Sequence, residues 1–136
     1  RINFFNCNTR NINEVKKFEN LLIKKKSENL DIIIDDASHI YSDILNNFKI
    51  FFKKVKSGGF YVIEDLNHYK YYSHLNDSSS DSLGIEEILK LLKNGQIFKS
   101  SILDEEFQNY CFNNILDISI HKGIQDDSYI AFVKKK

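Results

Sequence analysis

The sequence predicts an α/β fold built on a partial Rossmann-like sheet, and three features carry this prediction. Residues 30–35 contain three consecutive isoleucines, an apolar run typical of a central parallel strand that is buried on both faces. The amphipathic residues 42–56 and the β-prone residues 60–64 follow, so that strand, helix and strand form a βαβ unit. Residues 115–121 and 128–134 flank a short polar connection, which predicts a C-terminal antiparallel β-hairpin.

The other segments extend this pattern, and we expect helices on both faces of the sheet. Residues 2–7 are apolar and β-prone and predict a strand, while residues 11–26 carry apolar side chains at helical spacing. Ser57-Gly58-Gly59 is expected to end the helix over 42–56, because glycine readily adopts the left-handed conformation of a C-cap. Residues 67–82 predict a long polar loop, and residues 83–92 predict a further helix.

Length and composition limit the kind of protein that this chain forms. The 136 residues, 42% of them hydrophobic, suffice for one domain with an apolar core. The formal net charge is zero, which argues against nucleic acid and anionic membranes as partners. No apolar run approaches the roughly 20 residues of a membrane span, and the two cysteines fit reduced thiols. A cytoplasmic enzyme fits these observations, with neither nucleic acid nor a membrane as its partner.

Acidic pairs end two successive strands of the predicted sheet. Asp35 and Asp36 end one strand, and Glu64 and Asp65 end the next. In parallel sheets, ligands bind beyond these carboxyl ends, and neighbouring strands lie about 4.8 Å apart. Carboxylates crowded there require a cation or shared protons, and oxygen ligands favour Mg²⁺, Mn²⁺ or Ca²⁺. In the alternative interpretation, Asp36 caps the next helix and Glu64 is simply exposed.

His39 lies at the same predicted edge, three residues after Asp36. An unperturbed imidazole titrates near neutrality and can take a proton from an alcohol, so His39 is a candidate general base. His68 could line a substrate cleft, but an exposed or structural position is the simpler interpretation for His68, His74 and His121. The predicted loop also carries tyrosines that could form a lid over a sugar or pack the loop down: Tyr69, Tyr71 and Tyr72.

Two motifs give the chain a family resemblance. Asp-Ile-Ile-Ile-Asp-Asp-Ala-Ser-His at residues 31–39 and Ser-Gly-Gly-Phe-Tyr-Val-Ile-Glu-Asp-Leu at residues 57–66 resemble class I S-adenosylmethionine-dependent O-methyltransferases of the macrocin and mycinamicin type. The cephalosporin hydroxylase-like proteins are relatives of that family. The resemblance covers residues 1–70, and the expected hairpin is of the type that closes the methyltransferase sheet.

The resemblance implies S-adenosylmethionine and Mg²⁺ (or Mn²⁺) as cofactors, and a sugar hydroxyl or glycosylated metabolite as methyl acceptor. It implies that His39 is the general base and that Asn8 and Asp35 contact the methyl donor. It also implies three metal ligands: Asp36, Glu64 and Asp65. The family has a histidine directly after Glu-Asp-Leu, where this chain has Asn67.

The resemblance further implies that residues 1–136 are a single domain, the C-terminal part of a methyltransferase domain without its N-terminal cofactor-binding strands. The glycine-rich loop that holds the methyl donor is not recognisable in the sequence, and we expect further residues upstream of Arg1. Without the missing strands, the edge of the strand over residues 30–35 would be open, and we expect one of three outcomes. Residues 2–7 pair directly with residues 32–34, two copies of the chain pair edge to edge, or the chain is a fragment of a larger protein. Two other functions remain open, a Mg²⁺-dependent hydrolase on the same fold and a non-catalytic interaction domain.

Overall fold

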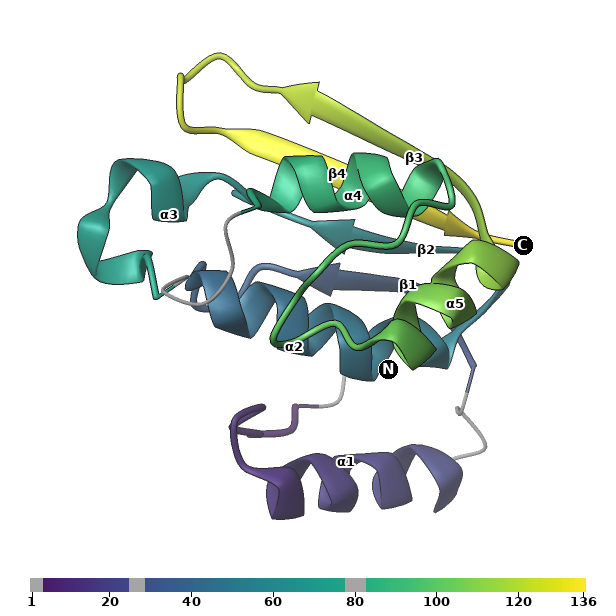
Figure 1. Cartoon of the computed structure of the whole chain (residues 1–136). Helices are drawn as coiled ribbons and strands as arrows, with labels where there is room; N and C mark the ends of the chain where they lie inside the picture. The colour runs from purple at the N-terminus through teal and green to yellow at the C-terminus, as the bar shows by residue number, and fades with distance from the viewer. Residues whose placement is uncertain (1–3, 25–28, 78–82) are drawn as a thin grey trace.

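The computed structural model describes residues 4–24, 29–77 and 83–136. Its strands are β1 (Leu30–Asp35), β2 (Val55–Ile63), β3 (Ile115–Lys122) and β4 (Tyr129–Lys135). Its α-helices are α1 (Ile12–Lys24), α2 (Tyr41–Phe51), α3 (His68–Tyr71), α4 (Ile85–Lys93) and α5 (Glu105–Asn114), with short 3-10 helices at Phe52–Lys54 and Ser73–Leu75. Helices α2, α4 and α5 lie on one side of the sheet, and α1 lies beside α2 (Figure 1).

The sheet is mixed and runs in the order β1–β2–β4–β3. β1 and β2 are parallel, with Asp35 opposite Ile63, whereas β4 is antiparallel to both β2 and β3. The predicted α/β class is therefore confirmed. Because β1 and β2 are neighbours and run in the same direction, the residues that follow them emerge at the same edge of the sheet.

The core lies between the sheet and the helices on its covered face. Phe48 of α2 is buried at its centre, with ring centroids of Phe52, Tyr61 and Phe107 at 5.2, 5.4 and 5.4 Å. Aromatic rings at these separations contribute packing beyond the burial of their area. The cluster joins α2 to β2 and to α5, and it holds the helix that starts next to the candidate site.

The opposite face of the sheet is open within the described residues. Ile32 and Ile34 are 58% and 60% exposed, and they line a shallow apolar hollow with Phe60 and Val62. The expectation that residues 30–35 are buried on both faces, under helices on both sides, is thus wrong for the described part of the chain. A continuous apolar run shows that both faces of a strand are apolar, but it does not show what covers them.

Helix α1 packs against the edge of α2 rather than over this open face. The rings of Phe18 and Phe51 lie 6.1 Å apart, and Glu19 forms an ion pair with Lys54 at 2.8 Å. The helix predicted over residues 11–26 is confirmed for residues 12–24, and the rest of its predicted C-terminal end lies outside the described residues.

The N-terminal segment is not a strand where the structure describes it. Residues 4–8 have no regular structure, and the chain turns at Thr9 and Arg10 before entering α1. The strand predicted over residues 2–7 is therefore wrong for residues 4–7, while residues 1–3 lie outside the described residues. β1 is an edge strand, and the expected pairing of residues 2–7 with residues 32–34 does not occur among the described residues. The β propensity of a short run depends on its partners, which the sequence does not supply here.

Gly58 and Gly59 lie inside β2 and do not cap a helix, so the predicted C-cap is wrong. The parallel register shifts between the pairs Leu30–Val55 and Ile32–Phe60, and the glycines occupy this irregularity. Gly58 has φ +78°, and a Cβ atom on Gly59 would lie 2.5 Å from the carbonyl oxygen of Asp31. Glycine is needed here for a bulge and for close approach of two backbones.

Helix α5 has no counterpart among the predicted elements. Asp104 caps it, with its Oδ1 accepting a hydrogen bond from the Phe107 amide at 2.8 Å. The buried face includes Gln108, whose side-chain amide donates hydrogen bonds to the carbonyl oxygens of Phe98 and Leu103. A buried polar residue interrupts the apolar stripe by which a helix is recognised in sequence.

The helix lengths and the cysteines agree with the expectations from composition. No helix in the described ranges is long and apolar enough to cross a lipid bilayer. Cys7 and Cys111 are both free thiols, and burial raises the pKa of Cys111 to about 12. Cys111 is therefore an unreactive core residue at neutral pH.

The substitution Gly59→Ala is expected to destabilise the fold by about 1–3 kcal/mol, because the added methyl group would overlap backbone and side-chain atoms of the adjoining segments. Urea denaturation measures the free energy of unfolding. Ser57→Ala, at an exposed position of the same strand, is the matched control and should change it little. Equal stability of the two variants would contradict the close approach of β1 and β2.

Candidate functional site

The candidate site lies where the chain leaves β1 and β2. The amide of Glu64 donates a hydrogen bond to the carbonyl oxygen of Asp35 at 3.0 Å, so the two strand ends are joined directly. Residues 36–40 lead from β1 into α2, and residues 64–67 lead from β2 into α3. Parallel pairing thus brings together the first motif, at His39, and the second motif, at Asp65.

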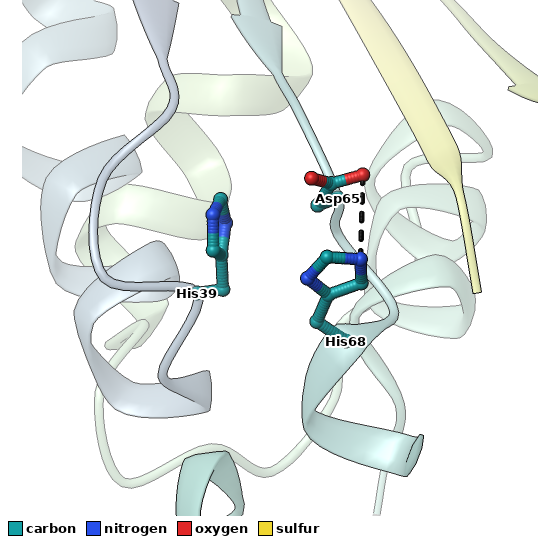
Figure 2. A group of neighbouring side chains, drawn as sticks. All are labelled: His39, Asp65 and His68. Atoms are coloured by element: carbon teal, nitrogen blue, oxygen red, sulfur yellow. Dashed lines mark ion pairs between the residues drawn. The ribbon is translucent and has the colours of Figure 1, made fainter. Parts of the chain in front are cut away.

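Three side chains converge at this edge: His39, Asp65 and His68 (Figure 2). One donor atom of each lies within 4.8 Å of the others, and the Nε2 atom of His68 is 3.5 Å from Oδ1 of Asp65. The two imidazole rings meet edge to face, with centroids 5.1 Å apart. Their side chains are 23% and 21% exposed and that of Asp65 is 31% exposed, so each is half-buried yet reachable from solvent.

The backbone is left-handed at two of these residues. His39 has φ +56° and Asp65 has φ +48°, and they are the non-glycine residues with positive φ among those described. Such conformations cost roughly 1–3 kcal/mol each and concentrate at functional sites.

Asp43, a buried residue of α2, holds the loop that carries His39. Its Oδ2 accepts a hydrogen bond from the hydroxyl of Ser38 at 2.5 Å, and its Oδ1 accepts one from Nε of Arg10 at 2.6 Å. Because hydrogen bonds between charged partners are strong and directional, this network stabilises the turn next to His39.

The loop after β2 is fastened to the β3–β4 turn. The hydroxyl of Tyr71 donates to the carbonyl oxygen of Asp126 at 2.8 Å, and that of Tyr72 donates to Oδ2 of Asp127 at 2.9 Å. The same Asp127 carboxylate lies 3.8 Å from Nε2 of His68. Of the two interpretations of the loop tyrosines, the structure supports packing of the loop onto the body of the protein.

Asp35, predicted to contact the methyl donor, is buried at the end of β1. Its carboxylate accepts hydrogen bonds from the hydroxyl of Tyr61 at 2.9 Å and from the side-chain amide of Asn47 at 3.2 Å. Burial raises the pKa of Asp35, although both hydrogen bonds act in the opposite direction. One edge of this region is still accessible, because Asp35 and Asp36 line a hollow together with Thr9, the neighbour of Asn8.

The other predicted site residues, Asp36, Glu64 and Asn8, do not belong to this cluster. Asp36 is 60% exposed and its Oδ1 lies 3.6 Å from Nε2 of His39. Helix α2 has Ile40 at its N-cap, so Asp36 is not the capping residue. Glu64 is half-buried and lines the apolar hollow of the open sheet face. Asn8 accepts a hydrogen bond from the Arg10 amide in the turn before α1. The roles assigned to these residues stay predictions.

His68 belongs to the cluster, although the sequence favours an exposed or structural position for it. The motif resemblance points to the position after Leu66, where Asn67 is buried and reaches Glu86 at 3.5 Å. A turn in which the His68 amide bonds the Asp65 carbonyl oxygen at 3.0 Å returns His68 to the site. The spacing of three residues between Asp65 and His68 was the available signal, because that spacing returns a side chain to the same side of a turn.

Comparison with known proteins points to methyltransferases. No protein-family model matches the chain. The L-olivosyl-oleandolide 3-O-methyltransferase of Streptomyces antibioticus is 51% identical over 35 residues, which are 26% of this chain and 9% of that protein. The demethylmacrocin O-methyltransferase of Streptomyces fradiae is 53% identical over 36 residues, again 26% of this chain and 9% of that protein. The resemblance to macrocin-type sugar O-methyltransferases is thus confirmed over a short segment.

A solved structure extends the similarity to most of the chain. The MycE methyltransferase from the mycinamycin biosynthetic pathway, in complex with Mg, SAH and mycinamycin VI, aligns with a TM-score of 0.56 and 26% identity. The alignment covers 88% of this chain and 29% of MycE. The chain therefore shares its fold with part of a methyltransferase and spans less than a third of that protein's length.

The substitution Asp35→Ala is expected to lower the free energy of unfolding by about 2–4 kcal/mol, because it leaves two buried donors without an acceptor. Asp31→Ala is the matched control in the same strand. Its carboxylate is exposed and paired with Lys56, and such surface pairs contribute about 0–1 kcal/mol. Chemical denaturation compares the variants, and an equal effect would show that Asp35 does not connect the elements around it.

Proposed function

We propose that this chain is the C-terminal part of an S-adenosylmethionine-dependent O-methyltransferase, assisted by a divalent cation, that acts on a sugar hydroxyl or a glycosylated metabolite. The observation that carries the proposal is the convergence of His39, from the first motif, and Asp65, from the second, at one edge of the sheet. The similarity to macrocin-type enzymes and to the MycE complex supports it.

The acidic residues that follow the two strands are our candidate ligands for an oxygen-ligated cation. Oδ1 of Asp36 lies 3.6 Å from Nε2 of His39, a carboxylate oxygen of Asp65 lies within 4.8 Å of a His39 ring nitrogen, and Glu64 directly precedes Asp65. Carboxylate oxygens are suitable ligands for Mg²⁺ or Mn²⁺, which prefer oxygen. We assign Asp36, Glu64 and Asp65 to the metal. When bound, a cation of this kind orients neighbouring hydroxyl groups of a sugar and lowers the pKa of the attacking one.

His39 then acts as the general base. A lone pair of the acceptor hydroxyl oxygen attacks the methyl carbon, the O–CH₃ bond forms, and the S–CH₃ bond of the sulfonium breaks with its electron pair left on sulfur. The hydroxyl proton passes to the imidazole of His39. Methyl transfer is an in-line displacement and depends mainly on positioning. The left-handed backbone at His39 and the Asp43 network next to it hold the imidazole at the edge of the site.

The methyl donor is assigned to the side of the site next to β1. Asp35 and Asp36 line a hollow there with Thr9, and we place Asn8 and Asp35 at the donor. β1 is an edge strand and the sheet face beside it is open, which supports the assignment of residues 1–136 to the C-terminal part of a larger methyltransferase domain.

The substitution His39→Asn is expected to lower kcat for methyl transfer by about 10²- to 10⁴-fold, the usual contribution of a general base. Asparagine tolerates a left-handed backbone, so the variant removes the base without adding strain. His74→Asn, in the exposed loop nearby, is the control and should keep the full rate. Transfer is measured on the full-length protein with S-adenosylmethionine, Mg²⁺ and a glycosylated acceptor. A His39→Asn variant with full activity would rule out the base.

The substitution Glu64→Gln is expected to raise the Mg²⁺ concentration required for half-maximal transfer by about 10-fold or more, because one anionic ligand becomes neutral. Glu87→Gln, at an exposed position of α4, is the control. Calorimetry of the full-length protein with S-adenosylmethionine and Mg²⁺ provides the independent measurement. An intact fold that binds neither would end the methyltransferase proposal.

A further inference from the structure

The geometry points to a second cation site, formed by His39, Asp65 and His68, that binds Zn²⁺ in preference to Mg²⁺ and inhibits methyl transfer. The site differs from the proposed magnesium ligands because it adds two imidazoles and includes neither Asp36 nor Glu64. Only its inhibitory effect rests on the proposed function, and the binding of Zn²⁺ does not.

The composition of the cluster selects the metal. Two imidazoles and one carboxylate are a common ligand set for zinc with a position left open, whereas Mg²⁺ is bound almost wholly through oxygen. Affinity for a nitrogen-containing site also rises along the first-row series towards copper and zinc. The His39–Asp65–His68 cluster therefore discriminates against Mg²⁺ by the chemistry of its donor atoms.

The distances fit a small tetrahedral ion. With ligand bonds of about 2.0–2.1 Å, two donors of a tetrahedral zinc site lie about 3.4 Å apart. The Nε2 atom of His68 and Oδ1 of Asp65 are already 3.5 Å apart, too far for a hydrogen bond and right for two ligands of one ion. The remaining donor separations are at most 4.8 Å, so ion binding would have to draw these donors closer by about 1.4 Å at most. Figure 2 shows all three side chains bordering the same gap.

Each histidine also has a second carboxylate beside it. Asp36 lies 3.6 Å from His39, and Asp127 lies 3.8 Å from His68 while Tyr72 holds it by a 2.9 Å hydrogen bond. Asp127 lies beside the same Nε2 atom of His68 that faces Asp65, so the negative charge of its carboxylate favours a cation at that atom. The left-handed backbone at Asp65 and the fastened loop around His68 mean that little has to be ordered when the ion binds.

Occupation of this site is incompatible with the proposed catalysis. A zinc ion on His39 uses the lone pair that would accept the hydroxyl proton, and a zinc ion on Asp65 withdraws a ligand from Mg²⁺. His68 is the residue that separates the two sites, since it belongs to the zinc set and has no part in the magnesium set.

Titration of the full-length protein with Zn²⁺, without S-adenosylmethionine or acceptor, tests binding by calorimetry. We expect one ion per chain, and His68→Ala should weaken binding by about 100-fold, since even an outer-shell partner is worth roughly 10- to 100-fold. His74→Ala should bind as tightly as the unchanged protein. Co²⁺ absorption provides a second readout, with the intense visible bands of a four-coordinate site lost in His68→Ala.

Equal Zn²⁺ affinity in the unchanged protein and in His68→Ala would overturn the site. If circular dichroism shows that His68→Ala does not fold, Asp65→Asn replaces it, because asparagine tolerates the left-handed backbone at that position. Zinc should suppress transfer in the unchanged protein and in Glu64→Gln, but not in His68→Ala, each compared with its own zinc-free rate. If no transfer is detected at all, the proposed function fails while the binding experiment still decides the zinc site.

Discussion

The buried carboxylate of Asp35 is the interaction on which the candidate site depends. It ends β1 and accepts hydrogen bonds from Tyr61 of β2 and Asn47 of α2, so one side chain connects the three elements of the βαβ unit. Burying a carboxylate is unfavourable unless it is hydrogen-bonded, and the raised pKa of Asp35 shows that burial outweighs its two partners. The two hydrogen bonds of Asp35 fix the relative positions of the two strand ends, from which His39 and Asp65 emerge.

Beyond Asp35, two residues of the site have strained backbones, and hydrogen bonds restrain the loops on which the site residues lie. The left-handed backbones at His39 and Asp65 persist because neighbouring contacts fix them. Asp43 restrains the turn before α2, and the tyrosines of the following loop fasten it to the β3–β4 turn. An arrangement that is prepared in advance suits both a base that must meet a hydroxyl and a cluster that receives an ion, since neither needs the chain to reorganise.

Helices cover one face of the sheet, and the other face is exposed among the described residues. The helices α2, α4 and α5 complete a packed core on one face, whereas Ile32 and Ile34 are exposed on the other. The hollow to which we assign the methyl donor lies beside β1 and is lined in part by Asn47 and Phe51 of α2. The alignment with MycE spans 88% of this chain but 29% of that enzyme, in keeping with a proposal that further structure contributes to the donor site.

The sequence by itself determined the α/β class, the parallel β1–α2–β2 unit and the place of the two acidic motifs at strand ends. Apolar periodicity, and the succession of strands and helices along the chain, can be recognised from local sequence. Tertiary structure decided the rest. Exposure of Ile32 and Ile34 depends on what packs against them, and the two glycines serve a backbone approach between distant residues. His68 joined His39 because the loop after β2 folds back onto the hairpin. Contacts between segments far apart in the chain set these features, and the spacing of three residues between Asp65 and His68 is the local signal that accompanies them.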